Sequence, residues 1–110
     1  MTARPKFRYV RSKALMEAYR EIPCQSCGAD DGTVAGAHSN SGKMGKGLGR
    51  KATDYCASLC SKCHAKVDSS YSMTGEQRQA MWQAAHEKTV HELIKQWLWP
   101  TDVRYPDWLK

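Results

Sequence analysis

Four of the five cysteines fall into two Cys-x-x-Cys pairs, Cys24 with Cys27 and Cys60 with Cys63, and the segment 28–59 separates the pairs. Thiolate sulfur is a preferred zinc ligand, and structural zinc takes four ligands in a tetrahedron at about 2.3 Å. A two-residue spacer lets both sulfurs of a pair point to one centre. The pattern therefore predicts a structural zinc ion, Zn²⁺, held by these four sulfurs.

Disulfide bonds are the alternative use for paired cysteines. Residues 1–10 are basic but lack the apolar run of a secretory signal. We therefore expect a protein that remains inside the cell, where such pairs bind metal more often than they form disulfides. Cys56, the fifth cysteine, lies in the apolar run 55–59 and is predicted to be a small packed residue rather than a ligand. No stretch approaches the about 20 apolar residues that a membrane-spanning helix needs.

Three other residues between and after the pairs could support hydrolysis. His64 and Asp68 are four residues apart on an expected helix, so they share a face and could hold a divalent cation. His38 ends an expected strand, and an imidazole that titrates near neutral pH can act as a general base. Each has a simpler alternative. His38 could be a strand-end histidine without chemistry, His64 could hydrogen-bond to a zinc ligand or replace one, and Asp68 could be a solvated acid.

The balance of charge favours a polyanionic partner, with nucleic acid first. Seventeen Lys and Arg residues against eleven Asp and Glu give a formal net charge of +6. The segment 40–51 alternates glycines with cations and fits neither the Walker nor the dinucleotide-binding pattern. We predict that it contacts a nucleic-acid backbone, with a solvated loop as the alternative. Its candidate binding residues are Lys43, Lys46, Arg50 and Lys51.

Helix and strand signals surround these motifs. Ser12 is expected to cap a helix over 13–21, and short strands are expected over 33–38 and 55–59. Thr74, with Gln77 in a capping box, is expected to begin a long helix over 74–98, in which His86 and His91 are structural and the tryptophans belong to the core. The apolar side of that helix is predicted to comprise Trp82, Ala85, Val90, Leu93, Ile94 and Trp97.

These elements predict an α+β protein whose zinc-stapled ββα centre is flanked by N- and C-terminal helices. The 110 residues are the size of one domain. We place a basic arm at 1–11 and a single domain at 12–100, with the ββα core at about 22–72. The tail, 101–110, is expected to pack irregularly back onto the domain.

The motifs also resemble a known family over residues 22–82. Together they resemble the HNH (ββα-metal) endonucleases, in particular a small phage- and prophage-encoded group. The motifs that carry the resemblance are Pro23-Cys24-x-x-Cys27, Ala37-His38-Ser39-Asn40, Gly45-Lys46-Gly47-x-Gly49-x-Lys51-x-x-Asp54, Leu59-Cys60-x-x-Cys63-His64 and Asp68.

The resemblance implies a treble-clef-like ββα fold that hydrolyses DNA phosphodiester bonds in recombination or DNA processing. His38 would be the general base, and His64 and Asp68 would bind the catalytic cation, Mg²⁺ or another divalent ion. Two positions depart from the family pattern. Ala37 stands where these enzymes often have a metal ligand, and the middle asparagine falls at Tyr55, beside Asp54. Asp54 could accept a hydrogen bond from the His38 imidazole and orient the base.

We therefore expect a metal-dependent DNA endonuclease in the cytoplasm of a bacterial host cell. Its partners would be single-stranded or duplex DNA, together with recombination proteins, and no membrane. The rival interpretation is a non-catalytic zinc-knuckle module that binds DNA or RNA. A protein-interaction adaptor is the third class.

Overall fold

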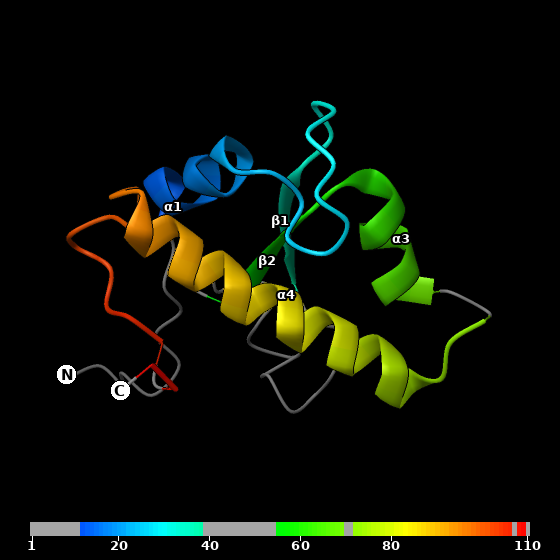
Figure 1. The fold of residues 1–110 in the computed structure, drawn as a ribbon. Helices are drawn as coiled ribbons and strands as arrows, with labels where there is room; N and C mark the ends of the chain where they lie inside the picture. The colour runs from blue at the N-terminus through cyan, green and yellow to red at the C-terminus, as the bar shows by residue number, and fades with distance from the viewer. Residues whose placement is uncertain (1–11, 39–54, 70–71, 107, 110) are drawn as a thin grey trace, which may run out of the picture.

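The computed structural model describes residues 12–38, 55–69, 72–106 and 108–109 (Figure 1). Its elements in chain order are α1 (Lys13–Ala18), the 3₁₀ turn η2 (Tyr19–Glu21), β1 (Ala35–His38), β2 (Cys56–Leu59), α3 (Ser61–Ser69) and α4 (Gly75–Lys95). The described residues thus form a small α+β protein with a two-stranded antiparallel sheet and three α-helices. The predicted class is confirmed at this level.

Side-chain caps begin two of the helices, as the sequence predicts. Ser12 Oγ accepts a hydrogen bond from the backbone amide of Leu15 at 3.0 Å, which starts α1. At α4, Thr74 Oγ1 accepts from the Gln77 amide at 3.0 Å, and Gln77 Oε1 accepts from the Thr74 amide at 2.9 Å. This reciprocal pair satisfies two amides that a helix start would otherwise leave without partners.

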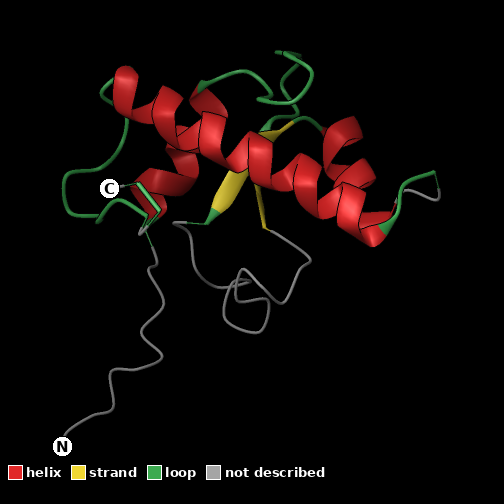
Figure 2. Cartoon of the chain, turned by 60° about the horizontal axis from the view of Figure 1, so that its bottom comes forward, coloured by secondary structure: helices red, strands yellow, loops and turns green. Residues whose placement is uncertain are grey.

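The hairpin β1–β2 is antiparallel, and its register places Ala35 opposite Leu59 and His38 opposite Cys56. Two isolated strands are marginally stable in water, so the hairpin needs a covering element. The helix α4 supplies it: Thr89 Oγ1 accepts from the Ser58 amide at 2.9 Å and donates to the Ala85 carbonyl at 2.7 Å. Figure 2 shows α4 running across the two strands, and every residue of β2 is buried.

Two hydrophobic clusters pack against successive parts of α4. One contains Cys24, Cys60, Cys63 and Val67 of α3, together with Trp82 and Ala85 from the middle of α4. The other contains Leu15 and Tyr19 packed against the later turns of α4. The two views agree that α3 lies near the beginning of α4 and α1 near its end (Figures 1 and 2). The hairpin lies between the two clusters and contributes Ala57 to the first and Cys56 to the second.

The end of α4 contradicts one prediction. The helix stops at Lys95, and Trp97 adopts a positive φ of 60° with 93% of its surface exposed. The expected apolar side is buried at Trp82, Ala85, Val90 and Leu93, but Trp97 is no part of it. The Leu98 amide bonds back to the Leu93 carbonyl at 2.8 Å, which closes the helix before Trp97 completes another turn.

Among the described residues, no helix is both long enough and apolar enough to cross a membrane. The tail returns to the domain, as expected. Val103 is buried, and Trp99 Nε1 donates to the Val103 carbonyl at 2.8 Å.

Candidate metal centre

The first cysteine pair lies in a tight turn between η2 and β1. The Cys24 amide donates to the Ala29 carbonyl at 2.8 Å, and the Gly28 amide donates to the Cys24 carbonyl at 2.9 Å. Gly28 has a φ of +84°, which a residue without Cβ adopts at little cost. The turn also aims the amides of Ser26 and Cys27 at Cys24 Sγ, each at 3.4 Å.

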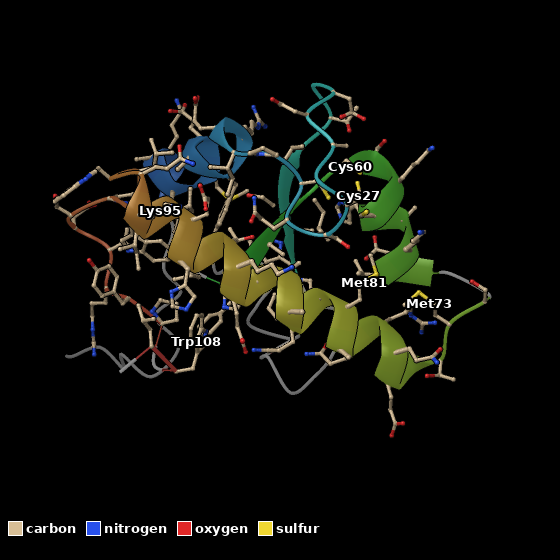
Figure 3. All side chains as sticks on the ribbon, viewed as in Figure 1. Cys27, Cys60, Met73, Met81, Lys95 and Trp108 are labelled. Carbon is tan, nitrogen blue, oxygen red and sulfur yellow. The ribbon has the colours of Figure 1, made fainter. Side chains whose placement is uncertain are left out.

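The second pair straddles the start of α3. Cys60 directly precedes the helix and Cys63 lies in its first turn, where the helical backbone turns both sulfurs toward the first pair. The His64 amide donates to the Cys60 carbonyl at 2.8 Å, so the helix begins within the cysteine pair itself. Figure 3 shows the sulfur atoms of Cys27 and Cys60 close together beside this helix.

The four sulfurs form one group. All lie within 4.8 Å of one another, and Cys27 Sγ is 3.6 Å from Cys60 Sγ. Two sulfurs at about 2.3 Å from one tetrahedral zinc ion would be about 3.8 Å apart. All five cysteines are free thiols, so these distances are not those of disulfides. The cluster therefore fits a structural metal ion such as zinc, and the predicted grouping is confirmed.

The pKa values of Cys24 and Cys63 are shifted in opposite directions, which favours a cation between them. Burial raises the pKa of Cys24, but hydrogen bonds from the amides of Cys27, Cys60 and Ser26 outweigh it and lower that pKa to about 6. Burial and the hydrogen bonds that Cys63 makes with the other sulfurs raise its pKa to about 12. A bound divalent cation would remove this conflict, because it stabilises all of the thiolates together.

Thr33 ties the two halves of the centre together. Its hydroxyl accepts a hydrogen bond from the Ser61 amide at 3.0 Å, at the start of α3. The same hydroxyl donates to Asp31 Oδ1 at 2.6 Å, and the Thr33 amide donates to that oxygen at 3.0 Å. These hydrogen bonds lower the pKa of Asp31. Thr33 thus serves α3 instead of extending β1, which begins at Ala35 rather than at residue 33.

His64 and Asp68 lie together on the exposed side of α3. Their Nε2 and Oδ2 atoms are 3.5 Å apart, and 41% and 45% of the two side chains are exposed. Two ligands of an octahedral divalent ion at about 2.1 Å would be about 3 Å apart, so this pair is close to the spacing of two ligands. It contributes two ligand atoms. Within the described residues, three or more His, Cys, Asp or Glu ligands converge only at the cysteine cluster.

His38 is the last residue of β1 and is half-buried. Its register partner is Cys56, the first residue of β2, so His38 lies at the end of the hairpin away from Cys60. On α3, Val67 belongs to the same buried cluster as Ala37. Successive residues of a strand point to opposite faces, so His38 lies on the face of the hairpin opposite Ala37, together with its register partner Cys56.

A second histidine lies behind this strand end. His86 of α4 is fully buried, and its Nδ1 is 2.8 Å from the Cys56 carbonyl oxygen. Trp108 Nε1 lies 3.0 Å from His86 Nε2, and because an indole nitrogen only donates, Nε2 must accept and Nδ1 must carry the proton. Burial lowers the pKa of His86, against opposing effects of the Cys56 carbonyl and of Glu87. Its expected structural role is confirmed, whereas nothing in the sequence identified its partners.

Of the other predicted residues, the structure describes some and not others. Asp54 and the candidate nucleic-acid-binding residues Lys43, Lys46, Arg50 and Lys51 lie outside the described ranges. Cys56 is buried and is not among the clustered sulfurs, as predicted. Comparisons with protein-family models, with curated proteins and with solved structures find no match to this chain.

Proposed function

We propose that this chain is a metal-dependent DNA endonuclease of the HNH (ββα-metal) type. The observation that carries the proposal is the His64–Asp68 pair, with 3.5 Å between Nε2 and Oδ2, on a helix that follows an antiparallel hairpin ending its first strand in His38. The cysteine cluster supports it, because it fixes the start of that helix. The net charge of +6 is the appropriate sign for a DNA substrate.

In this proposal, each side chain has a separate task. The His38 imidazole takes a proton from the water that attacks phosphorus, which requires the ring to be neutral at the working pH. His64 Nε2 and Asp68 Oδ2 hold a divalent cation, Mg²⁺ or another. Such a cation supplies positive charge to the scissile phosphate and the leaving oxygen. The backbone bond from His64 to Cys60 links the position of the His64 imidazole to the zinc ligands.

Nicking assays test the enzyme directly. Supercoiled plasmid and single-stranded DNA are incubated with the zinc-loaded protein in Mg²⁺ or Mn²⁺, beside His38→Ala and His64→Ala. We expect each substitution to lower the nicking rate by about 10²-fold or more. His91→Ala is the comparison variant, because His91 is an exposed histidine on α4 whose ring packs against Trp108, and its nicking rate should fall much less than that of His38→Ala. Equal nicking by His38→Ala and wild type would rule out the assigned base.

A non-catalytic zinc-knuckle module that binds nucleic acid is the second candidate. It is favoured by Ala37, which offers no metal ligand beside His38, and by the two ligand atoms that His64 and Asp68 provide. This module would bind DNA or RNA with an affinity that falls steeply with salt and would leave the strands intact. A protein-interaction adaptor, the third class, would show neither binding nor cleavage in the same assays.

A further inference from the structure

Two side chains of α4 hold the backbone on both sides of His38. Trp82 Nε1 donates a hydrogen bond to the Ala37 carbonyl at 2.8 Å, and Ala37 directly precedes His38. His86 Nδ1 donates to the Cys56 carbonyl at 2.8 Å, and Cys56 is the register partner of His38. Residues four apart share a helix face, so one face of α4 hydrogen-bonds to the end of β1 and to the start of β2, which lie side by side.

Aromatic stacking restrains the two side chains that make these hydrogen bonds. The rings of Trp82 and His86 are nearly parallel, with 4.8 Å between centroids and an interplanar angle of 7°. Tyr55, at the position where the HNH pattern would have its asparagine, stacks on the other side of His86 at 5.6 Å. Trp108 closes the stack edge-on at 5.6 Å while donating to His86 Nε2. Trp82 and His86 are at most 1% exposed, so water does not compete for their hydrogen bonds.

We propose that Trp82 and His86 are positioning residues for His38: they fix the backbone at the end of β1 and with it the direction in which the strand presents the imidazole. The inference rests on the proposed role of His38 as the general base. Small errors in the placement of a reacting group lower rates strongly, so a base at a strand end needs a fixed backbone. The stack supplies it from α4, through bonds to Ala37 and to Cys56 at the end of the hairpin away from Cys60.

A buried tryptophan elsewhere provides a matched control. Trp99 Nε1 donates to the Val103 carbonyl at 2.8 Å, the same kind of bond at the same distance as that of Trp82. The Trp99 bond closes the turn after α4 and reaches neither strand. Replacing either tryptophan by Phe removes one indole N–H and keeps an aromatic ring, so the two variants lose the same kind of hydrogen bond at different places.

The test reads the His38 ring itself in zinc-loaded, ¹⁵N-labelled protein. Long-range ¹H–¹⁵N spectra are recorded for wild type, Trp82→Phe and Trp99→Phe across the titration of the imidazole. We expect the His38 ring resonances and titration midpoint to shift in Trp82→Phe and to stay at their wild-type values in Trp99→Phe. In nicking assays, Trp82→Phe should lower kcat about tenfold with little change in KM, and Trp99→Phe should leave both unchanged.

A second variant covers the case in which Trp82→Phe does not fold. Trp108→Phe removes the donor to His86 Nε2 from a partly exposed tail residue, which frees the His86 tautomer and weakens its bond to Cys56. It should shift the His38 resonances in the same direction by a smaller amount. Unchanged His38 signals in a folded Trp82→Phe or Trp108→Phe protein overturn the positioning role. If the His38 signals shift in these variants but neither the wild type nor any variant nicks DNA, the positioning role stands and the nuclease proposal fails.

Discussion

The two ends of the hairpin β1–β2 are held by different chemistry. At the Cys60 end, four thiols lie within 4.8 Å of one another and fit a metal ion. At the Cys56 end, the buried side chains of Trp82 and His86 hold the strand carbonyls through hydrogen bonds and stacking. The first end fits an ion that would come from solution, whereas the hydrogen bonds and stacking of the second are all within the chain.

This difference separates stability from positioning. A four-sulfur site converts metal-binding energy into folding energy, so it can stabilise a chain with a small core without defining any reacting group. The aromatic end contributes less energy but touches the residue before His38. Removing the metal should therefore unfold the protein, and removing one aromatic hydrogen bond should leave it folded with a displaced histidine.

The largest expected effect comes from breaking the cysteine end. Cys24→Ser removes a buried ligand, and apparent zinc-binding free energies of about 10–16 kcal/mol match or exceed the whole stability of a small domain. We expect loss of zinc and of the cooperative thermal transition, as measured by metal analysis and circular dichroism. Chelator treatment of the wild type should have the same result.

Cys56→Ala is the matched control for that experiment. Its thiol is equally buried but outside the sulfur cluster, so the variant should keep its zinc and lose only the packing of one sulfur atom. A Cys24→Ser protein that remained folded with its zinc retained would show that the four thiols are not a metal site.

The next effect tests how tightly η2 packs on the middle of the hairpin. A Cβ built on Gly36 would lie 2.6 Å from Cδ2 of the fully buried Tyr19 ring. Gly36→Ala should therefore lower the free energy of unfolding by about 1–3 kcal/mol in chemical denaturation. Gly75→Ala, where the nearest atom is 3.8 Å away, should be neutral or slightly stabilising. Equal stabilities of the two variants would mean that Tyr19 does not rest against Gly36.

The aromatic end should respond to pH through His86. Its pKa is lowered in the folded protein, so the unfolded chain binds the proton more readily and stability falls as pH drops below the unfolded value of about 6.5. Protonation of His86 Nε2 would also remove the acceptor of the hydrogen bond from Trp108 Nε1. Between pH 6.5 and 5.5 we expect a loss of up to about 1 kcal/mol from this group, because the unfolded histidine is already half-protonated at pH 6.5.

The measurement compares wild type with His86→Phe, which keeps a ring between Tyr55 and Trp82 but does not titrate. Denaturation at several pH values gives the slope for each protein, and protonation of the thiols contributes equally to both. The wild type should lose more stability than the variant on acidification. Parallel slopes would show that His86 is not the group responsible.

The local parts of this structure could be predicted from sequence because their causes are local. Ser12 and the Thr74–Gln77 box cap helices through contacts three residues apart, and His64 and Asp68 meet because a helix turn brings them together. The sulfur cluster joins distant segments, yet ligand spacing was sufficient to predict it.

The aromatic end could not be predicted in the same way. The bonds from Trp82 to Ala37 and from His86 to Cys56 span 45 and 30 residues, and neither pair has a spacing rule. His86 resembles any polar residue on a helix until its neighbours are known. The prediction that Trp97 belongs to the apolar side of the helix was wrong for a related reason. The apolar periodicity of the sequence continues past Lys95, where the backbone leaves the helix.

The smallest expected effect concerns that helix end. Trp97 holds a left-handed conformation that glycine adopts most easily, and its side chain makes little compensating contact at 93% exposure. Trp97→Gly should raise the free energy of unfolding by about 0.5–1 kcal/mol, because relief of strain exceeds the added freedom of the unfolded chain. Trp97→Ala keeps the left-handed strain and should not stabilise, so thermal denaturation of the pair separates strain from loss of the indole. If Trp97→Gly were instead destabilised while Trp97→Ala were unchanged, the helix would not end in the conformation described.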